Sequence, residues 1–190
     1  MSPSIQVLAF SGSLRKASTN SGLLRVALEV VPEGMKIEVF DLSSIPFYNA
    51  DVEAVAVPDS VSDFKQRIAA ADALLIATPE YNYSISGILK NAIDWASRPP
   101  KSTPLTRKPI AIMGAGGAMG TVRAQLHLRQ VFGFSGALVM PKPELHIARA
   151  WEKFDSNGHL TDEKVKAEVR MLLEALSIWV NRVVQKKTEG

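Results

Sequence analysis

Hydroxyl, amide and guanidinium side chains gather in residues 11–20, directly after a short apolar run. A helical pattern begins where this segment ends. A helix N-terminus presents free amides and a partial positive charge, and serine and arginine side chains bind phosphate oxygens. The segment therefore predicts a phosphate site; the alternative is an ordinary helix cap with a solvated arginine. The polar residues concerned are Ser13, Arg15, Ser18, Thr19 and Asn20.

A second polar segment, residues 78–87, also follows an apolar run. It carries two tyrosines among proline, acidic, amide and hydroxyl residues. A flat heteroaromatic ring needs stacking surface on its face and hydrogen bonds at its edge, which this mixture supplies. The alternative is a turn started by proline, with tyrosines that pack on their neighbours. The residues of interest are Pro79, Glu80, Tyr81, Asn82, Tyr83 and Ser84.

A third segment, residues 114–120, is rich in glycine. Glycine lets backbone amides approach a ligand closely, so Gly116 and Gly117 are candidate donors. The segment resembles part of a dinucleotide fingerprint, but it follows the fourth apolar run rather than the first, and no acidic residue lies at the required distance. A flexible turn is the alternative.

Five apolar runs alternate with amphipathic stretches and must position these segments. The runs predict strands over residues 5–10, 35–42, 73–78, 109–114 and 137–140. The stretches between and after them predict helices over 20–31, 59–71, 87–97, 119–132 and 161–184, with Thr161 as the cap of the last. Residues 43–58 are expected to form a long connection.

The alternation predicts an α/β fold with a parallel sheet covered by helices on both faces, in a single domain over residues 1–190. Ligands of such sheets bind beyond the carboxyl ends of the strands, where the strand order reverses. The three polar or glycine-rich segments follow the first, third and fourth strands, so they are expected to meet there.

Composition excludes several classes of function. The 190 residues are 46% hydrophobic, carry a net charge of +3 and include no cysteine, which rules out disulfides, thiolate metal sites and cysteine nucleophiles. The chain shows no signal-peptide pattern, no apolar stretch near the roughly 20 residues that span a bilayer, and no long basic run. We therefore expect a cytoplasmic protein that neither enters a membrane nor binds nucleic acid.

Other residues that could do chemistry form weaker patterns. His127, His146 and His159 lack metal-ligand spacing and are expected at the surface or an interface, although Glu144 with His146 could form a site pair. No G-x-S-x-G elbow is present. The three tryptophans are interpreted as core residues (Trp95 and Trp179) and an interface residue (Trp151).

Five motifs together resemble the NADPH-dependent FMN reductase family, in particular its chromate and quinone reductase branch. They are G-S-L-R-K at 12–16 with Ser18 and Asn20, P-E-Y-N-Y-S at 79–84, L-K-N-A-I-D-W at 89–95, H-L-R-Q at 127–130 and K-P-E at 142–144. The likeness covers about residues 5–144 in the right order. This sequence departs from the family pattern with glycine in place of serine in the third segment and with Leu126 at a position where relatives can have tyrosine.

The resemblance implies a flavodoxin-like, doubly wound sheet of strand order 2-1-3-4-5 with bound FMN. The first segment, Thr19 included, would hold the phosphate, residues 79–84 would line the isoalloxazine ring, and Gly116 and Gly117 would offer amides to its pyrimidine edge. Hydride would pass from NADPH or NADH to FMN, and electrons would then pass to a small acceptor such as a quinone, a flavin or chromate, with no indispensable catalytic side chain. The family also implies a homodimer or homotetramer, in which residues 43–58 could reach a partner's site. The alternative is a flavodoxin-like electron carrier without nicotinamide turnover.

Overall fold

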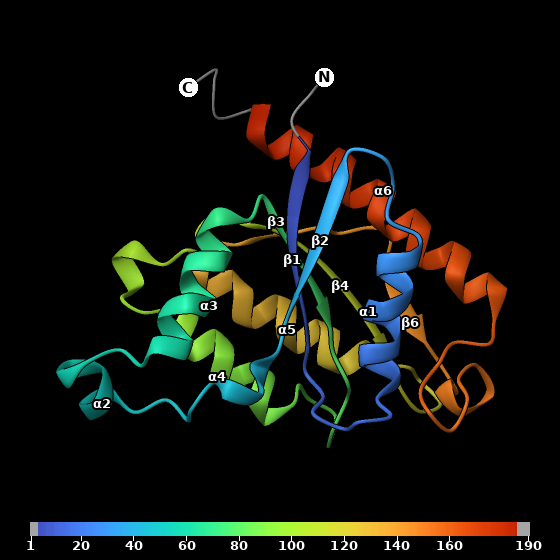
Figure 1. The fold of residues 1–190 in the computed structure, drawn as a ribbon, viewed down its shortest axis with the longest axis horizontal. Helices are drawn as coiled ribbons and strands as arrows, with labels where there is room; N and C mark the ends of the chain where they lie inside the picture. Colours follow the sequence, from blue (N-terminus) through green and yellow to red (C-terminus); the bar gives the residue numbers. More distant parts are fainter. Residues whose placement is uncertain (1–3, 186–190) are drawn as a thin grey trace.

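The computed structural model describes residues 4–185 as a twisted parallel sheet with helices on both faces (Figure 1). Strands run in the order β2-β1-β3-β4-β5, which confirms the predicted topology. Their bounds are β1 Ile5–Ser11, β2 Met35–Phe40, β3 Ala73–Ala77, β4 Pro109–Ala115, β5 Leu138–Val139 and β6 Leu145–Ile147. The central strands β3 and β4 are buried along their whole length, as expected of strands that are covered on both faces.

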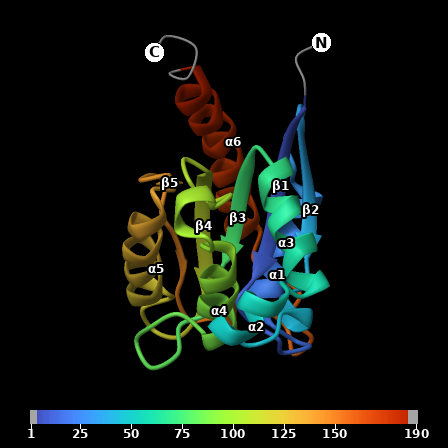
Figure 2. The same ribbon diagram turned by 90° about the vertical axis from the view of Figure 1, so that its left-hand side faces the viewer.

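Helices divide between the two faces (Figures 1 and 2). One face is covered by α1 (Thr19–Glu29) and α6 (Glu163–Gln185), whose apolar residues share a core cluster with β1 and β4. The other face is covered by α3 (Asp59–Ala70), α4 (Gly87–Ala96) and α5 (Val122–Ser135), which form a second cluster. None of the helices described within residues 4–185 is long and apolar enough to cross a membrane.

The strand predicted over residues 137–140 is present as the shorter β5, and a further short strand, β6, was not predicted. β5 pairs with the first residues of β4, and β6 pairs with its last three, so the two short strands share one neighbour. Pro141 and Pro143 lie between them. Proline cannot donate to a sheet ladder, so a single continuous strand could not form there.

The connection over residues 43–58 is more ordered than expected. It follows a short 3-10 turn, η1 (Leu42–Ser44), and contains α2 (Ala50–Val55). The segment is fastened to α4 because the Asn91 side chain accepts from the Tyr48 amide and donates to the Pro46 carbonyl, both at 2.8 Å. The indole of Trp95 donates to the same carbonyl at 2.8 Å and is 1% exposed, as expected of a core residue.

Two helix starts differ from the prediction. α5 begins at Val122 rather than near residue 119, because Gly117 and Gly120 close a tight turn before it. α6 is capped by Asp162, whose carboxylate accepts from the Lys164 and Val165 amides at 2.9 and 3.2 Å. The prediction of Thr161 as the cap was wrong, since its hydroxyl donates to the Lys153 carbonyl instead.

Candidate flavin-binding crevice

The carboxyl ends of β1, β3 and β4 surround a crevice of about 400 Å³. It brings together the three segments singled out in the sequence. All the predicted site residues line it except Asn82, Tyr83 and Ser84, and Ala115 joins them. The lining residues are Ser13, Arg15, Ser18, Thr19, Asn20, Pro79, Glu80, Tyr81, Ala115, Gly116 and Gly117.

The first loop runs from the end of β1 into α1. Ser18 caps the helix by accepting from the Ser21 amide at 3.2 Å, and the first amides of a helix have no partner within it. Arg15 is exposed, and within residues 4–185 its guanidinium has no carboxylate partner. Free amides, hydroxyls and an unpaired guanidinium therefore face the same opening, which suits a phosphate.

Asn20 differs from the other polar residues of this loop because its side chain is already engaged. It is 3% exposed, donates to the Ala115 carbonyl at 2.9 Å and accepts from the Ala115 amide at 3.0 Å. This pair of bonds ties the start of α1 to the end of β4. In this geometry the amide braces the floor of the crevice and does not reach outward to a phosphate.

The second loop closes into a tight turn. Tyr81 and Ser84 exchange backbone hydrogen bonds at 3.0 and 2.9 Å, and the two residues between them have left-handed backbones, with φ of 49° at Asn82 and 65° at Tyr83. Asparagine tolerates that region, whereas tyrosine rarely adopts it. A cost of this kind persists only where surrounding contacts impose the conformation.

Glu80 and Arg123 impose it. The Glu80 carboxylate, 10% exposed, accepts from the Arg123 and Ala124 amides at 2.9 and 3.1 Å and from the Arg123 guanidinium at 3.2 Å. Thr121, at the cap position of α5, makes no side-chain cap bond, so Glu80 caps this helix from another loop. The Arg123 guanidinium lies 4.1 Å from the centre of the Tyr83 ring, a favourable cation–π distance.

The glycines of the third loop are required by close packing. A Cβ on Gly114 would lie 2.4 Å from the Thr78 carbonyl, and one on Gly116 would lie 2.4 Å from the Gly120 carbonyl. The Gly116 amide donates to the Ile147 carbonyl at 3.0 Å. Among the described residues the Gly117 amide has no acceptor. Of the two amides expected to be free for a ligand, Gly116 and Gly117, only that of Gly117 is therefore free.

His146 lies behind this loop on β6. Burial lowers the pKa of its imidazole, while nearby Glu144 acts in the opposite direction. Hydrogen bonding to Lys142 lowers the pKa of the Glu144 carboxyl. The His146 Nε2 and Glu144 Oε2 are 3.8 Å apart, and the backbone of His146 would contact a Cβ on Gly120 at 3.1 Å. His146 therefore packs against Gly120, behind the glycine loop.

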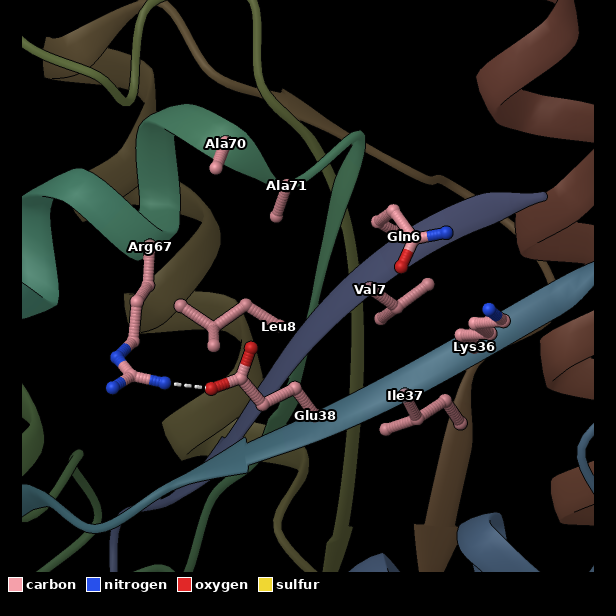
Figure 3. A pocket seen from close by; sticks show the side chains of 9 residues that line it. All are labelled: Gln6, Val7, Leu8, Lys36, Ile37, Glu38, Arg67, Ala70 and Ala71. Atoms are coloured by element: carbon pink, nitrogen blue, oxygen red, sulfur yellow. Dashed lines mark hydrogen bonds and ion pairs between the residues drawn. The ribbon is translucent and has the colours of Figure 1, made fainter. Parts of the chain in front are cut away.

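A separate hollow of about 380 Å³ lies along β1, β2 and the last turns of α3 (Figure 3). Two of its charged side chains are paired: Arg67 bonds to Glu38 across the opening and to Asp63 at 2.9 Å. The hollow borders the beginnings of the strands (residues 6–8 and 36–38) and not their carboxyl ends. We assign no function to it.

Fold and crevice together define a flavodoxin-like oxidoreductase, and comparison with known proteins specifies the class. The profile of the NADPH-dependent FMN reductase family matches residues 5–152, and the chain belongs to that family. It is thus an FMN-dependent NAD(P)H oxidoreductase, as the sequence motifs indicated.

Individual relatives are similar over nearly their full length. The chain is 52% identical over 184 residues to an NAD(P)H-dependent FMN reductase of Pseudomonas aeruginosa (96% of this chain, 99% of the relative). It is 47% identical over 180 residues to an NAD(P)H:quinone oxidoreductase of Solanum tuberosum (92% of each). Among solved structures, the flavoenzyme NAD(P)H:(acceptor) oxidoreductase FerB of Paracoccus denitrificans superposes with a TM-score of 0.84 at 35% identity, covering 94% of this chain and 98% of that one.

Proposed function

We propose that the crevice holds FMN with its phosphate at the α1 N-terminus and its ring beside the tyrosine turn, and that the reaction passes electrons from NAD(P)H to a quinone. The Arg15 guanidinium carries this proposal, because a cation that has no partner within residues 4–185 and lies beside free helix amides fits a dianionic phosphate. The quinone is the acceptor that the names of several relatives indicate, including the Escherichia coli quinone reductase at 38% identity.

The residues of the crevice bind and orient. Ser13, Arg15 and the amides of Thr19 and Asn20, which line the crevice, would bind phosphate oxygens, and the Gly117 amide would donate to the polar edge of the ring. Bound FMN supplies the two-electron chemistry between nicotinamide and acceptor. Tyr81 and Tyr83 are 53% and 67% exposed and offer aromatic surface where the ring and a stacked ligand would lie.

A spectrum of the FMN-loaded protein tests the function. Addition of NADPH or NADH under nitrogen should bleach the flavin band near its absorbance maximum, and a quinone should then restore it over repeated cycles. A protein that binds FMN but is not bleached by either nucleotide would be an electron carrier, and the proposed turnover would be wrong. A protein that takes up no FMN would refute the site itself.

We further propose that two copies of the chain associate, in the cytoplasm where NAD(P)H is available. Several large apolar side chains stay exposed: Phe47 is 84%, Val55 89% and Phe134 77% exposed. Phe47 lies between Pro46 and Tyr48, whose backbones are fixed to Asn91, so its ring is held outward by a rigid support. Light scattering should give a mass of at least a dimer. If the surface around Phe47 is the interface, Phe47→Ser should shift the measured mass towards that of the monomer.

A further inference from the structure

The turn after β6 is joined directly to the glycine loop of the crevice. The Gly116 amide donates to the Ile147 carbonyl at 3.0 Å, the Arg149 amide to the Gly117 carbonyl at 2.8 Å and the Ala150 amide to the Gly116 carbonyl at 2.9 Å. Gly116 and Gly117 line the crevice. These three backbone hydrogen bonds, one of them from the Arg149 amide, hold the turn over residues 147–150 at the rim of the crevice.

Arg149 occupies this place at a conformational cost. Its backbone is left-handed, with φ of 49° and ψ of 54°, a region that L-residues with a Cβ rarely adopt. Asparagine or glycine would fit the same turn more easily. The turn itself does not require arginine at this position. The presence of a long cationic side chain there therefore indicates that the side chain has a role of its own.

The guanidinium of Arg149 remains available. The side chain is 63% exposed, and its one ion pair among the described residues is with Glu152 at 3.3 Å, itself 44% exposed. Exposed pairs of this kind are weak and open readily. Two other cations near the crevice are less suited to a second anion: Arg123 bonds to Glu80 and contacts Tyr83, and Arg15 is the proposed ligand of the FMN phosphate.

Trp151 follows two residues later, in the short 3-10 turn η3 (Ala150–Glu152), and is 66% exposed. The other two tryptophans bury most of their surface and donate their indole N–H to backbone carbonyls, Trp95 to Pro46 and Trp179 to Leu138, each at 2.8 Å. The Trp151 indole has no such partner among the described residues. An exposed aromatic ring and an exposed guanidinium, held only by the ion pair with Glu152, thus lie two residues apart on one turn at the rim.

We propose that Arg149 and Trp151 form the adenylate subsite of the reducing cosubstrate. The inference rests on the proposed function, because the nicotinamide must stack at the ring and the other half of the dinucleotide must then extend across the rim. Trp151 stacks on the adenine, which needs a flat apolar partner. Arg149 binds the 2′-phosphate, the anionic group that distinguishes NADPH from NADH, by forked hydrogen bonds.

The first test compares two arginines with nearly the same surroundings. Arg170 pairs with Glu174 at 3.1 Å and is 61% exposed, much like Arg149 with Glu152, but it lies on α6 away from the crevice. Arg149→Gln should raise the KM for NADPH about 5- to 20-fold, as expected for loss of a charged hydrogen bond. It should leave the KM for NADH and kcat at saturating nucleotide unchanged. Arg170→Gln should change none of these values.

The second test needs no turnover. FMN-loaded protein is titrated calorimetrically with adenosine 2′,5′-bisphosphate; Arg149→Gln and Trp151→Leu should each weaken binding about fivefold or more, and Trp151→Phe should restore part of the Trp151→Leu loss. Trp151→Leu should also raise the KM for NADPH and for NADH alike, because both carry adenine. The bisphosphate should quench tryptophan fluorescence in the wild type and much less in Trp151→Phe.

The outcomes separate this inference from the proposed function. If NADPH bleaches the flavin in every variant with unchanged KM values, the subsite is wrong while the oxidoreductase function stands. A Trp151→Leu variant that changes oligomeric mass but not nucleotide binding would make Trp151 an interface residue and likewise overturn the subsite. If wild-type protein is not bleached by either nucleotide but still binds the bisphosphate at Arg149, the proposed turnover fails and the subsite remains.

Discussion

The loop after β1 and the turn after β3 border the same crevice but use their polar groups in opposite ways. In the first loop, Arg15 and Lys16 are exposed and Ser13 is half-buried, and within the described part of the chain the Arg15 guanidinium has no protein partner. In the turn after β3, the Glu80 carboxylate is 10% exposed and accepts three hydrogen bonds from α5. The first loop leaves its arginine without a protein partner among the described residues, whereas the turn after β3 uses its carboxylate to fix its own shape.

This difference distinguishes binding residues from positioning residues. A polar side chain that already has its partners gains little from a ligand, whereas one that lacks them can gain a charge-assisted hydrogen bond. Substitutions in the first loop should therefore lower flavin affinity and leave stability nearly unchanged. Substitutions in the second should lower stability and affect the ligand through the geometry of Tyr81 and Tyr83.

Asn20 should give the largest effect, because it belongs to the open loop but is engaged like Glu80. Asn20→Ala removes two buried hydrogen bonds and leaves the Ala115 amide and carbonyl without partners, which costs about 2–4 kcal/mol. Urea unfolding of the FMN-free protein measures the loss. Ser13→Ala, in the same loop but half-buried, serves as the control and should change the unfolding free energy by less than about 0.5 kcal/mol. If both variants lose the same unfolding free energy, the loop does not separate into a structural residue, Asn20, and a residue free for a ligand, Ser13.

The hydrogen bonds of Asn20 and Glu80 show which parts of the site could not be predicted from the sequence. The meeting of the three segments was predictable, since β1, β3 and β4 are apolar runs and the carboxyl ends of parallel strands share one edge of a sheet. The strand order came from the resemblance to the family and not from the apolar runs. The bond between Asn20 and Ala115 joins residues 95 positions apart, and that between Glu80 and the Arg123 amide joins residues 43 apart. No local pattern encodes such partners, so both side chains were interpreted as ligand contacts.

Smaller elements were missed for a different reason. α2 buries none of its residues, so it has no apolar periodicity to detect. Strand β6 has three residues, too few for a period to show, whereas β5 lies within the strand predicted over residues 137–140. Arg149 and Trp151 could have been noted only as a cation near an aromatic, because their place at the rim depends on backbone bonds to Gly116 and Gly117.

Arg15→Ala should give the next largest effect and tests the first loop, whose arginine has no protein partner among the described residues. Loss of a charged hydrogen bond to phosphate weakens FMN binding about 10- to 100-fold, measured by quenching of FMN fluorescence on titration. The urea midpoint of the FMN-free protein should not move. The neighbouring Lys16→Ala is the control for general charge and should weaken binding much less, because Lys16 does not line the crevice. If Arg15→Ala binds FMN with wild-type affinity, the proposal that the phosphate lies in this loop is wrong.

Glu80→Ala tests the turn after β3, whose charge is already paired. In contrast to Arg15→Ala, it should affect stability more than FMN affinity. It removes a helix cap and a half-buried ion pair, so stability should fall by about 1–2 kcal/mol. FMN affinity should fall less than in Arg15→Ala, and the KM for nucleotide should rise more than kcat falls because the tyrosine turn loosens. Glu174→Ala, an exposed residue on α6, is the stability control. A variant that loses FMN binding without losing stability would make Glu80 a direct ligand.

His146 should give the smallest effect, through pH. Burial lowers the folded-state pKa of His146 below its ordinary value near 6.5, with Glu144 opposing this shift and Arg129 and Lys142 adding to it. As pH falls below about 6.5 the unfolded chain takes up this proton first. The unfolding free energy should therefore decrease from pH 7.5 to 5.5 and stop responding to this group below its folded-state pKa. His146→Gln should flatten the part of this slope that His146 contributes, measured as the wild-type minus variant difference in urea unfolding across those pH values. A difference that increases with rising pH is the predicted sign; the opposite sign would mean that the contact with Glu144 outweighs burial, and that the glycine loop is supported by an ion pair rather than by a neutral ring.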